Sequence, residues 1–257
     1  MLRYLKPVIT FIPYVIGCYF GWILKYSKHP DKYPIEERYQ KVRGLIKRLN
    51  KAMDVEVHVE GKENIPESVC LFVSNHVGNY DPLIIVREAD KPVSVVSKIE
   101  VESYSFVGKL IKSIEGVFID RKDLKQSLKE MIVVTHELEE KKKSWLIFPE
   151  GTRNRDDKRL LRNFHAGSLK PASKTNTPIV PVVVYGTQRI TKLHPHYKKY
   201  PVYIEFCPAI YPEQYQDKNP QELADMVREI IQQRLTYKAR KNDHEEMIKY
   251  NGKKYHI

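Results

Sequence analysis

From residue 55 onward, the hydrophobic positions of the chain form short runs rich in β-branched and aromatic residues, which alternate with helical patterns. Runs of this composition predict strands. They are residues 55–60, 70–74, 93–97, 116–119, 145–148, 179–185 and 202–206. Alternation of strands with helices is typical of an α/β domain. We therefore predict an α/β fold with a mixed, largely parallel sheet that is flanked by helices.

Two longer segments carry hydrophobic residues at helical spacing. Asp123 and Gln126 form a capping pair at the start of residues 123–141, and Asn219 opens a second helix in the same way. On one face the first helix carries Leu124, Leu128, Met131, Ile132, Thr135 and Leu138. The second carries Leu223, Met226, Val227, Ile230, Ile231 and Leu235. We expect the domain to span residues 51–236, followed by a polar, basic C-terminal tail at residues 237–257.

The N-terminal segment at residues 7–24 contains no charged residue, and basic residues flank it on both sides. Its length is at the lower limit for a membrane-spanning helix, and Pro7 and Pro13 would disturb such a helix. Its tyrosines and Trp22 suit the boundary between lipid and water. No cleavage site of a signal peptide follows. The sequence leaves three alternatives, which are a shallow or re-entrant anchor, a true span, and a buried helix of the core.

Residues 35–53 predict a second N-terminal helix, which is basic and amphipathic. Its apolar positions are Val42, Leu45, Ile46, Leu49 and Met53. Around them lie Arg38, Lys41, Arg43, Lys47, Arg48 and Lys51. A helix of this kind suits a membrane surface, and it equally suits packing on the domain with its charges in water. Residues 1–50 are thus predicted as a membrane-associated hydrophobic anchor plus a basic amphipathic helix.

Composition adds an expectation about partners. The 257 residues contain 44 Lys plus Arg and 32 Asp plus Glu, so the formal net charge is +12, and the mean hydropathy is −0.50. These values exclude a polytopic membrane protein and favour an anionic partner, which is nucleic acid, an anionic lipid surface or a phosphorylated substrate. Cys18, Cys70 and Cys207 lie too far apart for a zinc ribbon or a disulfide framework. His194 and His196 form only a short pair, so we expect no metal site.

A candidate base follows the strand predicted at residues 70–74. His76 lies in a loop, and Asp81-Pro82 has the pattern of a helix N-cap followed by the proline favoured at the first helical position. Across this turn the Asp81 carboxylate can reach the His76 imidazole, fix its tautomer and leave the other nitrogen to accept a proton from a substrate hydroxyl. About 0.4 such pairs are expected by chance. The spacing alone therefore favours an ordinary helix cap beside a loop histidine.

Two further strand ends carry arginines. Residues 148–153 (FPEGTR) follow a predicted strand, and Arg121 follows another. Gly151 permits close approach of the backbone to a ligand, and the planar guanidinium of Arg153 matches phosphate oxygens. A base at one strand end and arginines at two others indicate an alcohol substrate that carries a phosphate. The alternative is that these residues form surface ion pairs with their acidic neighbours.

In these motifs the chain resembles the glycerolipid acyltransferases of the 1-acylglycerol-3-phosphate acyltransferase type. Four blocks occur in the family's order, namely NHxxxxD at 75–81, VFIDR at 117–121, FPEGTR at 148–153 and IVPV at 179–182. The resemblance covers about residues 55–210 and implies that His76 is the general base and Asp81 its orienter. It associates the glycerol phosphate with Arg121, Glu150, Gly151, Thr152 and Arg153. It also points to Lys98 as a further basic residue of the site.

The resemblance implies an enzyme that moves a fatty acyl group to the sn-2 hydroxyl of 1-acylglycerol 3-phosphate (lysophosphatidic acid). The product is phosphatidic acid, so the reaction belongs to phospholipid biosynthesis. The co-substrate is acyl-CoA or an acyl carrier protein thioester, and no cofactor is implied. We expect the enzyme on the inner (cytoplasmic) face of the cell membrane. The family also allows glycerol 3-phosphate or another lysophospholipid as the acceptor.

Two non-catalytic alternatives remain, a basic nucleic-acid-binding protein and a lipid-surface module. The first rests on the basic runs at 141–143, 153–162 and 198–199, with Tyr197 and Tyr200 available for stacking. The sequence lacks a recognised nucleic-acid module, and its apolar N-terminus would tether it to a membrane. We therefore expect no nucleic acid partner.

Overall fold

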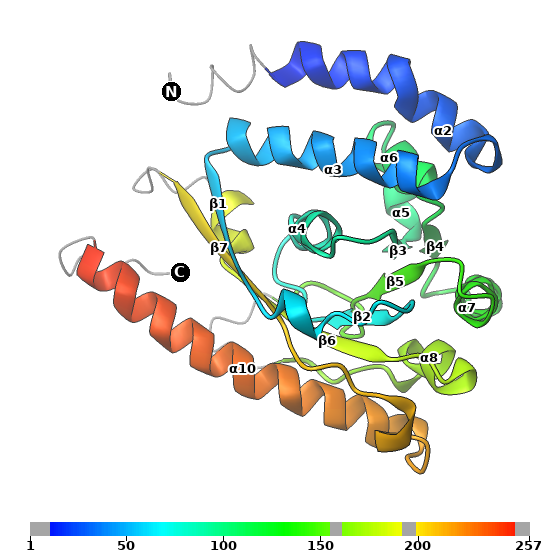
Figure 1. Cartoon of the computed structure of the whole chain (residues 1–257), viewed down its shortest axis with the longest axis vertical. Coiled ribbons are helices and arrows are strands. Elements are labelled where there is room, and N and C mark those ends of the chain that lie inside the picture. Colours follow the sequence, from blue (N-terminus) through cyan, green and yellow to red (C-terminus); the bar gives the residue numbers. More distant parts are fainter. Residues whose placement is uncertain (1–10, 155–160, 192–198, 250–257) are drawn as a thin grey trace.

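The computed structural model describes residues 11–154, 161–191 and 199–249, and within these the side chains of residue 191 and residues 238–249 are not described. Its centre is a seven-stranded sheet with the order β1-β7-β6-β2-β5-β3-β4 (Figure 1). The strands are β1 (Val55–Glu60), β2 (Leu71–Ser74), β3 (Val93–Lys98), β4 (Val117–Ile119), β5 (Ser144–Ile147), β6 (Ile179–Tyr185) and β7 (Tyr200–Phe206). Every predicted strand is present.

The sheet is mixed and largely parallel, as predicted. β6 and β7 form an antiparallel pair, and the remaining neighbours are parallel. Parallel strands place their carboxyl ends at one edge of the sheet. The loops that follow β2, β3, β4, β5 and β6 therefore share this edge, which carries the motifs singled out in the sequence.

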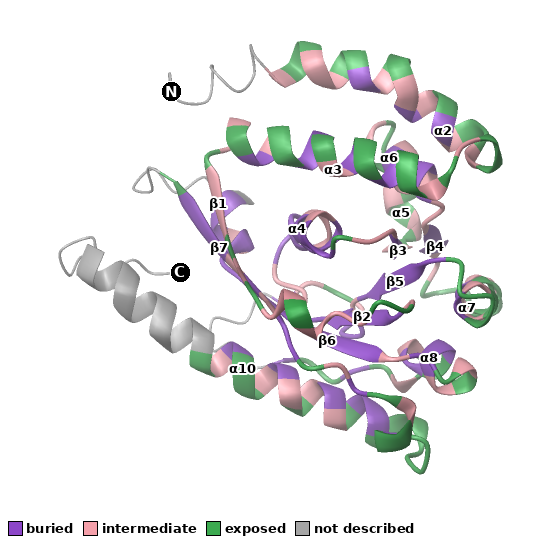
Figure 2. Cartoon of the chain, viewed as in Figure 1, coloured by how far each residue is buried: buried purple, intermediate pink, exposed green. Residues whose placement is uncertain are grey.

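Helices cover both faces of the sheet. They are α2 (Leu24–Lys28), α3 (Ile35–Ala52), α4 (Asp81–Glu88), α5 (Ile99–Glu102), α6 (Val107–Ser113), α7 (Leu124–Glu139), α8 (Lys170–Thr175), α9 (Thr187–Thr191) and α10 (Pro220–Lys249). One core unites α3, α4 and α6 with one face of the sheet. The other unites α7, α8 and α10 with the opposite face. The alternation along β5 shows the division, because Leu146 belongs to the first core and Trp145 and Ile147 to the second. β5 as a whole is buried (Figure 2).

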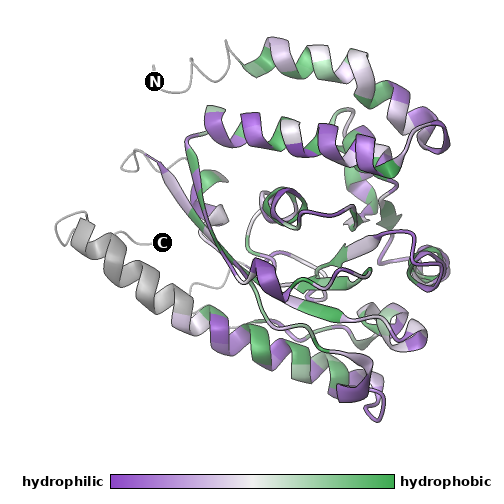
Figure 3. Ribbon diagram, viewed as in Figure 1, coloured by the Kyte–Doolittle hydropathy of each residue, from purple (hydrophilic) through white to green (hydrophobic). Residues whose placement is uncertain are grey.

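The first described helix is only half buried. It starts at residue 11, includes a π-helical stretch at Tyr19–Ile23 and continues into α2. Ile23 is buried in the first core, whereas Ile12, Ile16 and Phe20 are exposed by 47%, 51% and 70%. Hydrophobic residues dominate its first turns (Figure 3). This exposure excludes a fully buried core helix. Within the described residues, no helix has the length and apolar character needed to cross a membrane.

The basic amphipathic helix α3 packs on the domain with its apolar face. Val42, Leu45 and Ile46 are buried in the first core. Arg38, predicted on the charged face, is also buried, because its guanidinium donates to the Ser113 carbonyl at 2.8 Å and to Glu115 at 2.7 Å. Lys41, Lys47 and Lys51 stay exposed.

The predicted C-terminal helix is present, and it is longer than expected. The Glu222 N–H donates to the Asn219 side chain at 3.0 Å, and the Asn219 N–H donates to Glu222 at 2.8 Å, which completes a capping box. Leu223, Val227 and Ile231 are buried against the sheet. α10 continues to Lys249, so the segment predicted as a tail begins as helix.

The cap of α7 is also as predicted, since the Gln126 N–H donates to Asp123 at 3.0 Å. Its apolar face, however, is divided. Leu138 is buried, but Leu124, Leu128 and Ile132 are exposed by 81%, 59% and 59%. The helix is turned so that Val134 and Leu138 meet the sheet, which leaves much of the apolar pattern in water.

Candidate active site

The candidate site lies at the carboxyl edge of the sheet, where ligands bind in open α/β folds. His76 follows β2, Arg121 follows β4, and residues 148–153 follow β5. Thr187 follows β6 and starts α9. Strands that are parallel neighbours thus bring together segments that are more than one hundred residues apart in the chain.

His76 and Asp81 lie within hydrogen-bond distance, as the resemblance to the acyltransferases implies, and we refer to them as the dyad. His76 Nδ1 lies 2.7 Å from Asp81 Oδ2. A carboxylate accepts hydrogen bonds, so Nδ1 carries the proton and Nε2 is the basic nitrogen. The predicted cap is wrong, however, because the Asp81 carboxylate does not cap α4. It turns back onto the preceding loop, and α4 has no side-chain cap.

The Asp81 carboxylate is fully buried, and besides His76 it accepts hydrogen bonds from three donors. Its Oδ2 accepts the N–H groups of Val77 at 2.7 Å and Gly78 at 2.9 Å, and its Oδ1 accepts the hydroxyl of Thr187. Such donors stabilise a buried carboxylate and hold it in place. Gly78 is required at this turn, because a Cβ there would lie 2.8 Å from Thr187 Oγ1.

The imidazole of His76 is held on its face as well. Its ring stacks on Phe148 with centroids 4.2 Å apart and planes 26° apart. The side chain is 19% exposed, so the ring is fixed but accessible. Sequence reasoning gave Phe148 no role, although it opens the FPEGTR block.

Asn75, next to His76, ties β2 to β6. Its side-chain amide donates to the Val184 carbonyl at 2.9 Å, and its carbonyl oxygen accepts the Val184 N–H at 2.8 Å. The His76 carbonyl accepts the Asn154 N–H at 2.6 Å. The loop that carries His76 is therefore fixed to β6 and to the segment that follows β5.

Glu150 differs from its sequence interpretation as a ligand of the glycerol phosphate. It is buried, and its two oxygens accept the N–H groups of His76 at 2.9 Å and Arg162 at 3.0 Å. Burial raises the pKa of this carboxyl, and the two main-chain donors lower it by less. A carboxylate whose oxygens are both occupied, and which would repel a phosphate, serves as a clamp between the loop of His76 and the chain after residue 160.

Lys98, Arg121 and Arg153 are the cations that the sequence assigns to this edge of the sheet, and we call them the cationic rim. Lys98, at the end of β3, is exposed and forms an ion pair with Glu100. Partial desolvation lowers the pKa of Arg121, and the nearby Glu100 acts in the opposite direction. Arg153 is half-buried.

Gly151 brings the main chain between two side chains of the site. Its φ is +68°, and a Cβ there would lie 3.1 Å from the His165 ring and 3.8 Å from Arg121 Nε. A side chain at this position would be strained and crowded. Thr152, next in the chain, is exposed. The loop after β5 therefore lies beside Arg121, which follows β4.

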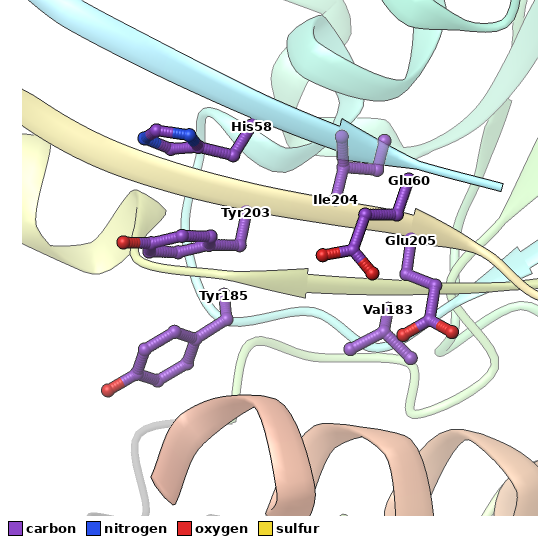
Figure 4. Close-up of a pocket in the computed structure, with 7 residues that line it drawn as sticks. All are labelled: His58, Glu60, Val183, Tyr185, Tyr203, Ile204 and Glu205. Carbon is purple, nitrogen blue, oxygen red and sulfur yellow. The ribbon is translucent and has the colours of Figure 1, made fainter. Parts of the chain in front are cut away.

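Two hollows lie outside this site. One, of about 10 Å³, lies on the face of the sheet that α10 covers and includes His58, Tyr203 and Glu205 (Figure 4). It is no larger than a single water. The other, of about 440 Å³, lies between the first helix and α3, with Tyr14 and Arg48 in its lining. Neither is lined by the dyad. Among the described residues, no cluster of three His, Cys, Asp or Glu could hold a metal ion.

The comparisons with known proteins show which family the chain belongs to. A family profile described as Acyltransferase matches residues 56–185. A protein of Mycoplasma pneumoniae, described as a probable 1-acyl-sn-glycerol-3-phosphate acyltransferase, is 31% identical over 226 residues, which cover 82% of this chain and 84% of the relative. The chain belongs to the 1-acyl-sn-glycerol-3-phosphate acyltransferase family. The resemblance inferred from the four sequence blocks, and with it the enzyme class, is confirmed.

Other members of this acyltransferase family match over most of their length. The 1-acyl-sn-glycerol-3-phosphate acyltransferase of Escherichia coli K12 is 27% identical over 241 residues, covering 91% of this chain and 94% of the relative. The crystal structure of the 1-acyl-sn-glycerophosphate (LPA) acyltransferase PlsC from Thermotoga maritima superposes with a TM-score of 0.70 at 24% identity, covering 92% of this chain and 94% of that one. The predicted fold class is thereby confirmed.

Two of the residues that suggested nucleic acid binding are placed differently from that expectation. Tyr200 is buried at the start of β7, and Lys143 is buried in an ion pair with Glu137 at 2.7 Å. Neither can stack on a base or contact a phosphate from these positions. Tyr197, His194 and His196 lie outside the described residues.

Proposed function

We propose that this acyltransferase moves an acyl group from a thioester to the sn-2 hydroxyl of lysophosphatidic acid, giving phosphatidic acid, with the dyad as its base. The observation that carries the proposal is the 2.7 Å contact between His76 Nδ1 and a fully buried Asp81. This contact leaves Nε2 free of its proton on an accessible ring. Membership of the family supports the same reaction.

The chemical step uses His76 in both directions. Nε2 takes the proton from the acceptor hydroxyl as its oxygen attacks the thioester carbonyl carbon. Asp81 stabilises the imidazolium that forms and keeps its orientation. When the tetrahedral intermediate collapses, the C–S bond breaks and the imidazolium returns the proton to the leaving thiolate. Protons and electron pairs balance without a covalent enzyme intermediate.

The phosphate of the acceptor is assigned to the cationic rim. Arg121 and Arg153 supply the planar forks that suit phosphate oxygens. Lys98 adds a point charge, shared with Glu100. Gly151 lets the main chain approach the ligand, and the exposed Thr152 offers a hydroxyl beside it. We leave Glu150 out of the phosphate ligands because its oxygens hold main-chain amides.

We also propose that residues 1–50 hold the domain of residues 51–236 on the inner face of the cell membrane. Ile12, Ile16 and Phe20 are exposed on the first helix. Lys41 and Lys47 are exposed on α3, which lies beside it across the 440 Å³ groove. An apolar surface next to cations suits anionic lipid.

The proposal is tested by acyl transfer in detergent with palmitoyl-CoA and three acceptors, namely lysophosphatidic acid, glycerol 3-phosphate and lysophosphatidylcholine. We expect phosphatidic acid from the wild type and a rate lower by about a hundredfold to ten-thousandfold for His76→Ala. The matched control is His58→Ala, an exposed histidine of β1 outside the site. If product forms only with another acceptor, then that acceptor is the substrate and lysophosphatidic acid is not. A His76→Ala rate within tenfold of the wild-type rate would show that His76 is not the general base.

A further inference from the structure

The outer side of α7 carries an apolar stripe that the fold leaves uncovered. Leu124, Leu128 and Ile132 are each four residues apart, so they lie on one face of the helix. We call these three residues the α7 stripe. They are exposed by 81%, 59% and 59%, while Val134 and Leu138 hold the helix to the sheet (Figure 2). A contiguous row of large aliphatic side chains in water is typical of a binding surface.

Cations border the α7 stripe. Lys122, Lys125 and Lys129 are exposed. Within the described part of the chain, none of them forms an ion pair. At the far end of α7 the situation differs, because Lys142 pairs with Glu140 and Lys143 with Glu137. Three exposed lysines without a described ion pair therefore lie beside the stripe, where they can attract an acidic partner, although Asp123 and Glu130 in the same segment offset part of their charge.

The stripe starts at the rim of the active site. Leu124 is three residues after Arg121, so at most about 11 Å of chain separates their Cα atoms. From Leu124 to Ile132 the helix rises about 12 Å. Arg121 itself lies beside Gly151, where a Cβ would be 3.8 Å from its Nε. A partner seated on the α7 stripe would therefore be next to the site that consumes the acyl thioester.

The position of α7 distinguishes a protein from a lipid surface. The first helix and α3, proposed as the membrane contact, belong to the core on one face of the sheet. α7 belongs to the core on the opposite face (Figure 1). A bilayer that contacts the first helix is thus separated by the sheet from the helix that carries the stripe. This separation favours a partner from the aqueous side.

We propose that the α7 stripe, with Lys122, Lys125 and Lys129, docks an acidic carrier domain that delivers the acyl chain as a thioester on a flexible arm. The proposal rests on the acyl transfer proposed above. The apolar stripe gives the contact its affinity, and the lysines select an acidic surface and speed its encounter. Acyl-CoA reaches the same thioester position without this contact. The surface therefore affects one class of donor and not the other.

The test compares kcat/KM for palmitoyl-acyl carrier protein and palmitoyl-CoA, with the same acceptor in the same detergent. One variant is Leu124→Ser with Leu128→Ser, and the second is Lys125→Glu with Lys129→Glu. These side chains are exposed, so the fold tolerates both changes. The matched control is Lys170→Glu with Lys174→Glu, an exposed pair of the same spacing on α8. We expect kcat/KM with the carrier to fall about tenfold or more in both variants, and kcat/KM with palmitoyl-CoA to stay within twofold of wild type.

Two other kinetic results would decide against the docking surface. An unchanged ratio of the two donors in both variants would overturn it. Equal losses with both donors, together with lost flotation on anionic vesicles, would assign the α7 stripe to lipid. Calorimetric titration of the carrier into His76→Ala protein separates docking from catalysis. Binding that the Lys125→Glu, Lys129→Glu change weakens supports the surface even if the proposed reaction fails, and absence of binding overturns it.

Discussion

The dyad is held by its own loop and by neighbouring strand ends, whereas Lys98 of the cationic rim lies exposed at the same edge of the sheet. Asp81 is fully buried and accepts two main-chain N–H groups and the Thr187 hydroxyl. Lys98, by contrast, is exposed and shares its charge with Glu100. A proton transfer needs positions held within fractions of an ångström. Attraction of a phosphate tolerates movement, because it depends on charge.

The comparison predicts that changes to the dyad lower kcat and that changes to the cationic rim raise KM for the acceptor. The largest effect is expected for Asp81→Asn. The amide has the size of the carboxylate but cannot stabilise an imidazolium, and its NH₂ group favours the wrong tautomer of His76. We expect kcat lower by about a hundredfold to ten-thousandfold with KM little changed, measured by steady-state kinetics.

The matched control for that variant is Asp225→Asn, an exposed aspartate of α10 whose side chain contacts only Gln221 in the described structure. Its kcat should equal that of the wild type. A kcat for Asp81→Asn within threefold of the control would mean that Asp81 has only a structural role in the loop.

The next effect concerns Arg121 and Arg153. Replacing either by Ala removes charge-assisted hydrogen bonds to the phosphate, so KM for the acceptor should rise about tenfold to a hundredfold with a smaller change in kcat. Arg121→Lys keeps the charge but loses the fork and should lie between. Arg234→Ala, an arginine of α10 that is about half exposed, is the control. An unchanged KM for the acceptor would show that the replaced arginine does not bind the phosphate.

The sequence predicted the strands from local signals, and it predicted the dyad from the NHxxxxD block, which resembles the acyltransferases. Each strand is a run of β-branched and aromatic residues, and His76 and Asp81 are five residues apart within one turn. The local sequence did not show toward which segment the Asp81 carboxylate turns. Aspartate before proline fits a helix cap, but the N–H groups of Val77 and Gly78 hold the carboxylate on the loop instead.

Contacts between distant segments could not be read from spacing. Thr187 is 106 residues from Asp81 in the chain, and it meets the dyad only because β6 pairs with β2 in parallel. Its position after a predicted strand was the one signal, and it required the strand order. The apolar pattern of α7 is local, but it was still not enough to predict which residues are buried. The pattern indicates a helix, but it does not show how far Leu124 and Leu128 are turned from the sheet.

Glu150 tests whether the loop of the dyad depends on its clamp. In Glu150→Gln the amide can accept one main-chain N–H but presents its own NH₂ to the other, and an unpaired buried donor costs about 1–3 kcal/mol. Burial raises the pKa of Glu150, so the native state holds its proton to higher pH than the unfolded chain, and the stability contributed by this group falls as pH rises from glutamate's ordinary pKa to the raised value. The stability advantage of the wild type over the variant should therefore narrow across this window.

The measurement is denaturant unfolding of both proteins from about pH 4 to about pH 8, with Glu229→Gln, an exposed glutamate of α10, as the control. An advantage of the wild type that grows with pH would contradict the raised pKa. A variant of unchanged stability at every pH would mean that the clamp is dispensable.

The smallest effect is expected at Thr187, which touches the dyad from outside its loop. Thr187→Val keeps the shape and removes the hydroxyl that donates to Asp81, while the two N–H donors and His76 remain. One lost hydrogen bond of about 0.5–1.5 kcal/mol lowers kcat about threefold to tenfold. Thr187→Ser restores the donor and should recover most of the rate, whereas an effect on size alone would leave Ser impaired. If Val equals wild type in kcat, then the loop fixes the dyad without help from β6, and the contrast with the cationic rim is sharper than proposed.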